Sequence, residues 1–335
     1  MKTPEIFQKD YPYVTTRVRV RGTKLLDRND YDNLLKMGPN EISRKLEEGQ
    51  YEEEINELGS QLEGVPLVES ALELNAATTL KELVELCPEG LAEILQVYIR
   101  RYELQSIKRI LRWKKTGEKE SIRPDLIPGI TYDLEDLERL SEKTYDEILQ
   151  DIVFDGLVDY QSYLEGKEDI KDVERSLDQA YFDELQKLSD KVGSRDFSEF
   201  IKAELEYENL RIILRLKKYG VEREEIEQKI FKDGFSELIE KSLDAENLDE
   251  LKEILEDSKW NVDVTKDVEE IEHGLDVERL RNARKNLRGS PLGVVPIVAY
   301  VVAKMTEVKN LRTLIQAKAT GIQSDEEIRE NLVIE

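Results

Sequence analysis

The segment ENLRIILRLKKYG, Glu208–Gly220, has two close counterparts in the same chain. Counted back from their final glycines, they are QSIKRILRWKKTG, Gln105–Gly117, and KNLRTLIQAKATG, Lys309–Gly321. Apolar residues recur at i, i+3 and i+7, which is typical of an amphipathic helix with one face to bury. The residues are Leu104, Ile107 and Leu111, then Tyr207, Leu210 and Leu214, then Val308, Leu311 and Ile315. We therefore expect the same helix three times.

Each copy also carries a helix stop signal. The final glycine is suited to a left-handed C-terminal cap, and a lysine in the last turn faces the negative end of the helix dipole. We expect that lysine, Lys217 in the quoted copy, to lie at the surface. The copies differ at a few polar positions: the third has Gln316 and Ala319 where the others have Arg and Lys, and the first has Ser106 where the others have Asn209 and Asn310. The side chains at these positions are therefore not equivalent.

The spacing of the copies indicates an internal repeat. Gly117 and Gly220 are 103 residues apart, and Gly220 and Gly321 are 101 apart. Other segments keep a similar offset: VESALEL from Val68 matches VERSLDQ from Val173 and VERLRNA from Val277, and LEEGQY from Leu46 matches LQDIVF from Leu149 and LEDSKW from Leu255. A period of about 100 residues is longer than solenoid repeats and close to a small domain. We predict three similar helical domains, residues 1–123, 124–225 and 226–335, in a pseudo-threefold arrangement.

The composition favours an all-α protein. Helix-forming residues dominate, alternating β-branched runs are scarce, and 39% of the residues are hydrophobic, enough for a core. The longest stretch without charge, Gly289–Ala303, contains two prolines and is shorter than the ~20 apolar residues of a membrane-spanning helix. We interpret it as a buried core helix.

The charge balance limits what the chain can bind, and the single cysteine limits the compartment in which we expect it. With 74 acidic and 50 basic residues the formal net charge is −24, so nucleic acid and anionic lipid would be repelled over most of the surface. The only cysteine, Cys87, excludes an internal disulfide, and no apolar segment follows the basic N-terminal start. We expect a cytosolic, unexported chain that binds no nucleic acid.

Signatures of catalysis are absent from the sequence. The only histidine, His273, leaves no pair for a metal helix, and there is no Walker A loop, Rossmann fingerprint, Asp-Asp-x-x-Asp motif or EF-hand spacing. We interpret His273 as a solvated helix-end residue and Cys87, Trp113 and Trp260 as packing residues. We expect no catalytic residue, metal or cofactor.

One basic segment stands out in this acidic chain. Arg17, Arg19, Arg21, Lys24 and Arg28 lie close together, and in a continuous helix Arg17, Arg21, Lys24 and Arg28 would share one stripe. The stripe is either a contact for an acidic partner or a surface that neutralises acidic helices of the same molecule. The sequence leaves both readings open.

Two further segments carry a family resemblance. They are YPYVTTRVRVRGTKLLDRNDYDNLL, Tyr11–Leu35, and PLGVVPIVAYVVAKMTEVKNLRTLIQAKATGIQSDEEIRENL, Pro291–Leu332. Together with the repeated helix, they make the chain similar over nearly its whole length to the C subunit of archaeal and bacterial A/V-type ATP synthases, a relative of the eukaryotic vacuolar ATPase d subunit. The resemblance implies a funnel of three helical domains that sits on the membrane rotor ring and receives the tip of the central stalk.

Our functional expectation follows from this resemblance. The chain would be a non-catalytic central-stalk subunit of a proton- or sodium-translocating ATPase that couples the shaft to the ring for ATP synthesis or ion pumping. It would lie peripherally on the cytoplasmic side of the cell membrane, held by the proteolipid ring and the stalk without inserting into lipid. A soluble all-helical adaptor and a metal-dependent helical enzyme built on scattered carboxylates are the alternatives.

Overall fold

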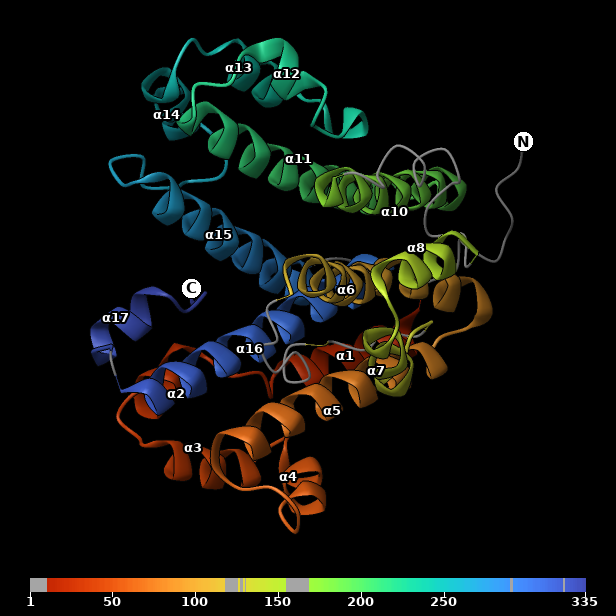
Figure 1. Cartoon of the computed structure of the whole chain (residues 1–335), viewed down its shortest axis with the longest axis vertical. Helices are drawn as coiled ribbons and strands as arrows, with labels where there is room; N and C mark the ends of the chain where they lie inside the picture. The colour runs from red at the N-terminus through yellow and green to blue at the C-terminus, as the bar shows by residue number, and fades with distance from the viewer. Residues whose placement is uncertain are drawn as a thin grey trace. The chain divides into compact units, whose positions relative to one another are not determined.

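The computed structural model describes residues 11–117, 126, 129, 131–154, 169–289, 292–321 and 323–335. These residues form helices joined by turns and loops, and there is no β-strand among them (Figure 1). The predicted all-α class is confirmed. The predicted domain boundary after residue 123 lies outside the described residues, and the one after residue 225 falls within a short helix, Arg223–Glu227. The division into three domains stays a prediction.

The described chain divides into two compact units. The first unit comprises residues up to Gly22, Gln186–Thr306 and Glu330–Glu335, and the second comprises Thr23–Leu185 and Glu307–Arg329. The boundaries cut two long helices, α10 (Ile170–Val192) and α16 (Val295–Thr320), so each of these helices contributes residues to both units.

The first unit is built around one long helix, α11 (Arg195–Lys218). The other helices that lie wholly within the unit are α1 (Pro12–Gly22), α12 (Arg223–Glu227), the 3-10 helix η3 (Lys232–Gly234), α13 (Glu237–Asp244), α14 (Leu248–Glu256) and α15 (Val268–Gly289). Helix α11 packs against α12, η3, α13, α14 and α15, and α1 packs against α15. The buried stripe Tyr207, Leu210 and Leu214 of α11 joins apolar residues of α13, α14 and α15 in one core.

The second unit is built around α5 (Gly64–Glu85) and α6 (Glu89–Thr116), which pack against each other. The remaining helices are α2 (Arg28–Leu34), α3 (Pro39–Glu47), α4 (Glu52–Leu58), α7 (Leu134–Glu142), α8 (Tyr145–Phe154) and α17 (Asp325–Glu330), the last residue of which belongs to the first unit. Helices α3 and α4 cover α5, and α7 and α8 cover α6.

Side-chain caps fix where the short helices begin. Asp27 before α2 and Asp133 before α7 each accept a hydrogen bond from the backbone N–H three residues on, and the side chains of Asp30 and Asp136 accept one from the backbone N–H of the cap. Ser236 caps α13 in the same position. These are the residue types that satisfy the free N–H groups of a first helical turn.

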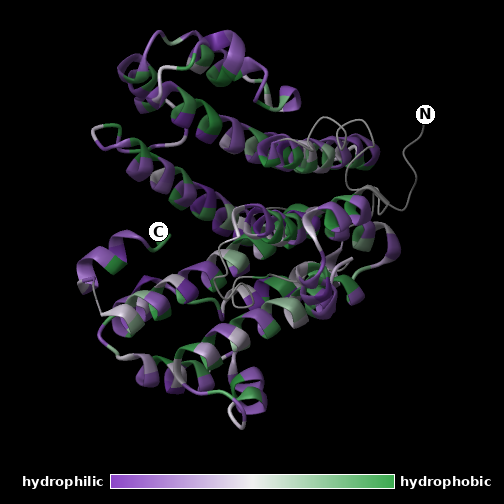
Figure 2. Ribbon diagram, in the orientation of Figure 1, coloured by the Kyte–Doolittle hydropathy of each residue, from purple (hydrophilic) through white to green (hydrophobic). Residues whose placement is uncertain are grey.

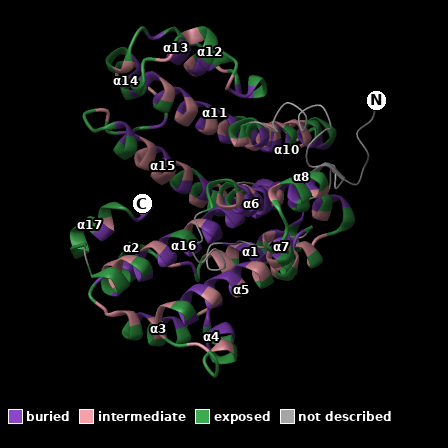
Figure 3. Cartoon of the chain, viewed as in Figure 1, coloured by how far each residue is buried: buried purple, intermediate pink, exposed green. Residues whose placement is uncertain are grey.

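The charge-free stretch becomes the first part of α16, where every residue from 295 to 303 is buried (Figure 3). The buried run includes Val298, Val301 and Val302, and Figure 2 shows hydrophobic residues along this helix. The prediction of a buried core helix is confirmed for this part of the stretch, while residues 290 and 291 lie outside the described residues. No helix in the described part of the chain is both long enough and apolar enough to cross a membrane.

Candidate functional site

The three repeated segments form the C-terminal parts of α6, α11 and α16. All nine stripe residues predicted to be buried are buried. The glycines that follow the helices, Gly117, Gly220 and Gly321, have φ angles of 72°, 67° and 63°, in the left-handed region. Both the buried face and the glycine cap of the repeated helix are confirmed.

Each copy also buries a glutamate that the sequence analysis missed. Glu103, Glu206 and Glu307 each lie fourteen residues before the glycine of their copy, and all three are buried. The sequence did single out this glutamate. From the glutamate up to the glycine, it and one lysine are the only residues that are identical in all three copies. A buried carboxylate is tolerated only where hydrogen bonds replace its water, so the donors around each glutamate define what it holds.

Glu307 on α16 binds the N-terminal helices of the second unit. Its carboxylate accepts hydrogen bonds from the backbone N–H of Leu26 at 2.6 Å, the amide of Gln50 at 2.9 Å and the hydroxyl of Tyr51 at 2.6 Å. Leu26 immediately precedes the cap of α2, and Tyr51 precedes α4. One carboxylate therefore holds both ends of the α2–α3 segment against α16.

Glu206 on α11 makes the corresponding contacts in the first unit. It accepts a hydrogen bond from the indole N–H of Trp260 at 2.8 Å and pairs with Lys259, also at 2.8 Å. Burial raises the pKa of the Glu206 carboxyl, but hydrogen bonds from Lys259, Ser236 and Trp260 outweigh it, and the pKa lies below its usual value. Glu206 is thus held as a carboxylate at the start of α13 and the end of α14.

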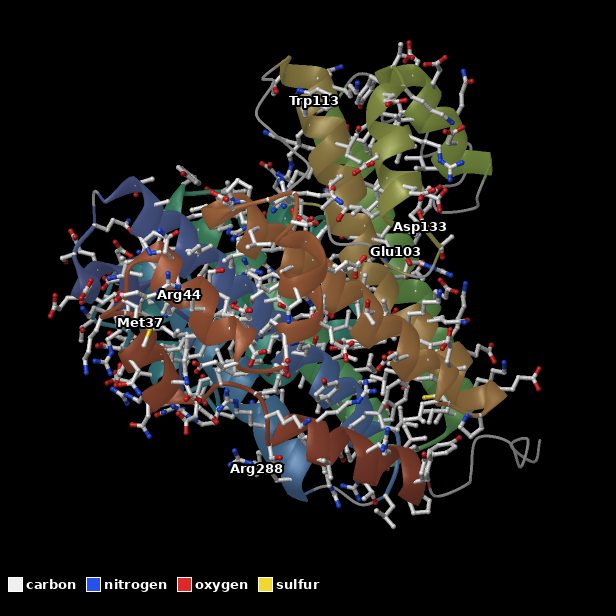
Figure 4. All side chains as sticks on the ribbon, turned by 90° about the horizontal axis from the view of Figure 1, so that it is seen from below. Met37, Arg44, Glu103, Trp113, Asp133 and Arg288 are labelled. Atoms are coloured by element: carbon white, nitrogen blue, oxygen red, sulfur yellow. The ribbon has the colours of Figure 1, made fainter. Side chains whose placement is uncertain are left out.

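Glu103 on α6 contacts the segment that leads into α7. Its carboxylate accepts a hydrogen bond from the backbone N–H of Thr131 at 2.8 Å (Figure 4, where Glu103 and Asp133 are labelled). A Cβ atom on Gly129 would lie 1.8 Å from the side chain of Glu103, so only glycine allows this approach. The helix α7 that follows is capped by Asp133.

Two of the donors occupy matching positions in the segments that the sequence analysis aligned. Tyr51 and Trp260 are the last residues of the matching segments LEEGQY and LEDSKW, and both donate to the buried glutamate of their own unit. The side chain of Phe154, which ends the third matching segment, lies outside the described residues. The sequence match between Tyr51 and Trp260 is therefore also a match of contacts.

The identical lysine three residues before the glycine has a structural role in two copies. Lys217 is buried and donates to the backbone carbonyls of Leu243 and Ala245 at the end of α13. Lys318 donates to the carbonyl of Leu35 at the end of α2. The expectation that Lys217 is a surface residue was wrong, because its long side chain reaches inward to carbonyls left free at a helix end.

A further set of contacts joins each repeated helix to a long neighbour. Five residues before the glycine, Arg112 pairs with Glu174 of α10 through two contacts, the longer at 2.7 Å, and Arg215 pairs with Glu272 of α15. In the third copy Gln316 donates to Glu69 of α5 at 2.8 Å. The change from arginine to Gln316 therefore replaces an ion pair with a hydrogen bond from a neutral amide to the same kind of partner.

These contacts correct one of the sequence matches. Glu69 and Glu174 follow Val68 and Val173, which start the matched segments VESALEL and VERSLDQ. In α15 the corresponding contact is made by Glu272, six residues before Glu278 of VERLRNA. The apparent match at Val277 is therefore out of register with the contacts.

The predicted partner-contact residues Arg17, Arg21, Lys24 and Arg28 do not share one helix. Helix α1 ends at Gly22, so Arg17 and Arg21 lie on α1, Lys24 lies in the turn that follows, and Arg28 begins α2. The first two belong to the first unit and the last two to the second. The continuous stripe is wrong, while the role of these cations as contacts stays a prediction.

The other residues singled out in the sequence occupy packing positions. Trp260 is buried, and Trp113 lies half-buried with the Lys114 ammonium 4.1 Å from its ring centre. His273 is half-buried in the second turn of α15 rather than at a solvated helix end. Burial raises the pKa of the Cys87 thiol to about 12, so its reactive thiolate form is disfavoured.

The chemistry of the arrangement is that of helix packing. Within the described ranges, no group of three or more His, Cys, Asp or Glu side chains is placed to hold a metal ion. The repeated polar contacts join helix ends to helix faces, and the three buried carboxylates accept hydrogen bonds in them.

Comparison with known proteins assigns the family. The sequence profile of the family described as ATP synthase (C/AC39) subunit matches residues 14–331. The C subunit of the A-type ATP synthase of Methanococcoides burtonii is 34% identical, over 97% of this chain and 94% of the relative. The corresponding C subunit of Halorubrum lacusprofundi is 31% identical, over 96% of this chain and 97% of the relative. That of Archaeoglobus fulgidus is also 31% identical, over 97% of this chain and 96% of the relative. The chain belongs to the ATP synthase (C/AC39) subunit family.

Proposed function

We propose that this chain is a non-catalytic rotor subunit of an A/V-type ATPase, which joins the central stalk to the membrane ring of proteolipid subunits and transmits torque between them. Torque transmission requires a body that does not deform under load. The proposal rests on the repeated helix and its buried glutamate. In each copy the carboxylate of this glutamate accepts hydrogen bonds from residues next to short helices and so attaches these helices to the long helix.

The family gives the proposal its setting. Membership of an ATP synthase subunit family implies partners in the same complex, and we place the chain on the cytoplasmic side of the membrane as a peripheral subunit. Because the net charge is −24, anionic lipid would repel most of the surface, and the protein ring and stalk would have to supply the binding. The proposal requires neither a metal nor a cofactor of this chain.

Sedimentation with vesicles tests the proposal. The purified chain is mixed at physiological salt with anionic vesicles, either bare or carrying the purified rotor ring, and the pelleted fraction is measured. We expect the chain to pellet only with ring-bearing vesicles. Because screening at this salt acts over about 8 Å, non-specific attraction to the headgroups would be weak.

Each other outcome has a defined meaning. Pelleting with bare vesicles would show direct lipid binding and contradict the proposed mode of attachment. Pelleting with neither preparation, in the presence and absence of the stalk subunits, would contradict the rotor role and favour the soluble adaptor.

A further inference from the structure

Two basic helical segments lie side by side in the first unit. Helix α1 contains three arginines and no acidic residue, and the last turns of α15, residues 281–289, contain Arg281, Arg284, Lys285 and Arg288 and no acidic residue. Helix α1 packs against α15. Figure 4 shows Arg288 at the end of α15 beside α1. In a chain with a net charge of −24, this juxtaposition makes a local basic surface.

The orientation of α1 on α15 is fixed by specific contacts. The backbone N–H of Tyr11 donates to the carbonyl of Leu292 at 2.9 Å, and Arg19 Nε donates to the carbonyl of Leu287, also at 2.9 Å. A Cβ on Gly22 would lie 2.5 Å from the Leu287 side chain, so glycine permits the close approach. With Val14 and Val18 buried, the opposite face of α1 points to solvent.

That outer face carries large apolar residues. Tyr13 is 64% exposed and Val20 is 56% exposed, and exposed Arg17 lies between them at helical spacing i, i+4 and i+7. In the described part of the chain, only Tyr219 and Phe235 are other large hydrophobic residues with comparable exposure. Helix α1 therefore has apolar residues on both its faces, although the described residues cover only one of them.

The cations around this face are not all used to neutralise the molecule itself. Arg281 pairs with Glu278, and Arg284 pairs with Glu335. Among the described residues, Arg17, Lys285 and Arg288 make no ion pair or side-chain hydrogen bond. Since acidic residues outnumber basic ones in the chain, two unpaired cations beside one exposed apolar face, Arg17 on it and Arg288 next to it, favour an external contact.

We propose that Tyr13, Arg17 and Val20 of α1, together with Arg288 of α15, form a docking surface for another subunit of the complex. The partner surface presents carboxylates around an apolar notch that receives Tyr13 and Val20. This inference rests on the function proposed above. Tyr and Arg are residue types that contribute most to binding at protein interfaces. A helix that binds a membrane surface has a broad apolar face, whereas the outer face of α1 has only two large apolar side chains.

The test measures the affinity of the full chain for an ATPase complex purified without this subunit, at several salt concentrations. The double variant Arg17→Glu, Arg288→Glu removes the charge match, and Arg44→Glu on α3 is the matched control because Arg44 is also exposed and unpaired in the described structure. Tyr13→Ala removes the apolar anchor, and Tyr219→Ala, which truncates the more exposed tyrosine at the end of α11, is its control. Circular dichroism and thermal unfolding confirm that each variant is folded.

We expect the double variant to bind at least about tenfold more weakly and to lose most of the salt dependence, because opposite charges across an interface contribute to both. Tyr13→Ala should weaken binding at all salt concentrations, and both controls should bind like the wild type. Equal binding by the double variant, Tyr13→Ala and the wild type would overturn this inference alone. A wild type that does not bind the complex would overturn the proposed function and this inference with it.

Two further measurements exclude other occupants. If the wild type binds anionic vesicles and the double variant does not, the surface binds lipid and the inference is wrong. If the wild type forms a dimer in sedimentation velocity that the double variant loses, the occupant is a second copy of this chain, and the inference is again wrong.

Discussion

At the residue scale, the glutamate that recurs unchanged is buried in all three copies, whereas the recurring lysine is buried in one copy, as Lys217, and half-buried in the other two. Lys217 was predicted at the surface, although it lies ten residues after Tyr207 on the helical face that also carries Leu210 and Leu214. A lysine at such a position is expected on the surface because its charge is costly to bury, but its stem can follow the core to a helix end. The donors to Glu206 and Glu307 could not be predicted, since they come from distant parts of the chain.

The first prediction concerns the buried carboxylate of the first unit. Glu206→Gln replaces a hydrogen-bonded carboxylate by an amide that cannot match all its donors, and we expect a loss of about 1 to 3 kcal/mol in the free energy of unfolding. Glu199→Gln, on the same helix but exposed, should change it by less than about 0.5 kcal/mol. Urea unfolding followed by Trp260 fluorescence in a Trp113→Phe background reports on the first unit. Equal losses in both variants would contradict the role of Glu206.

The second prediction is the pH dependence of that effect. The pKa of Glu206 is lower in the folded protein than its usual value, so its contribution to stability is fully present above the pKa of the unfolded chain, about 4.3. It is lost as the pH falls through the folded pKa. The stability difference between wild type and Glu206→Gln should therefore narrow progressively below about pH 4.3. A difference that grows on acidification would contradict this sign.

The third prediction concerns the buried lysine. Lys217→Ala leaves two carbonyls of the α13 end without their donor and should cost about 1 to 3 kcal/mol of unfolding free energy. Exposed Lys202→Ala on α11 should cost less than about 0.5 kcal/mol. Leu214→Ala, in the buried stripe, should cost about 2 to 5 kcal/mol. If Lys217→Ala matched Lys202→Ala, the carbonyl contacts would contribute nothing to stability.

At the element scale, the local features of the repeated helix followed from the sequence. The apolar period gave its buried face, and the glycine with its neighbouring lysine gave its end. Periodicity failed for the basic segment, because α1 stops at Gly22 where the chain packs closely against Leu287. Gly22, which follows Arg19 and Arg21, is a helix stop signal of the same kind, but the helical period alone does not take it into account. The match at Val277 also disagrees with the contacts, since Arg215 pairs with Glu272 and not with Glu278, and a sequence match does not show which residue of α15 faces α11.

The fourth prediction tests the helix caps. Gly220 has a positive φ, and a Cβ atom added to it would meet no neighbouring atom, so Gly220→Ala should destabilise through backbone strain alone, by about 1 to 2 kcal/mol. Gly289 also has open space but no positive φ, and it ends α15, so Gly289→Ala should be neutral or stabilising by up to about 1 kcal/mol. Thermal unfolding of the two variants is the measurement. A destabilised Gly289→Ala with an unaffected Gly220→Ala would contradict the assignment of the cap.

At the scale of the whole molecule, the third repeated helix obtains its partners from the start of the chain. The copies in α6 and α11 contact segments that follow them in sequence, whereas α16 contacts Tyr51, Glu69 and their neighbours. The N-terminal and C-terminal parts of the chain thus complete one set of contacts in the second unit. The sequence predicts a repeat of about 100 residues, but it does not show that the third repeated helix contacts the N-terminal part of the chain. A repeat length carries no information about which segments contact one another.

The central claim, that the chain couples the stalk to the ring, is tested most directly by the ratio of ions moved to ATP hydrolysed. The complex is reconstituted into vesicles with and without this chain, and ATP hydrolysis and ion uptake are measured together. We predict that the complex without the chain hydrolyses ATP with no ion uptake, and that adding the chain restores uptake at a constant ratio. Ion uptake that proceeds at the same ratio in the absence of the chain would contradict the account.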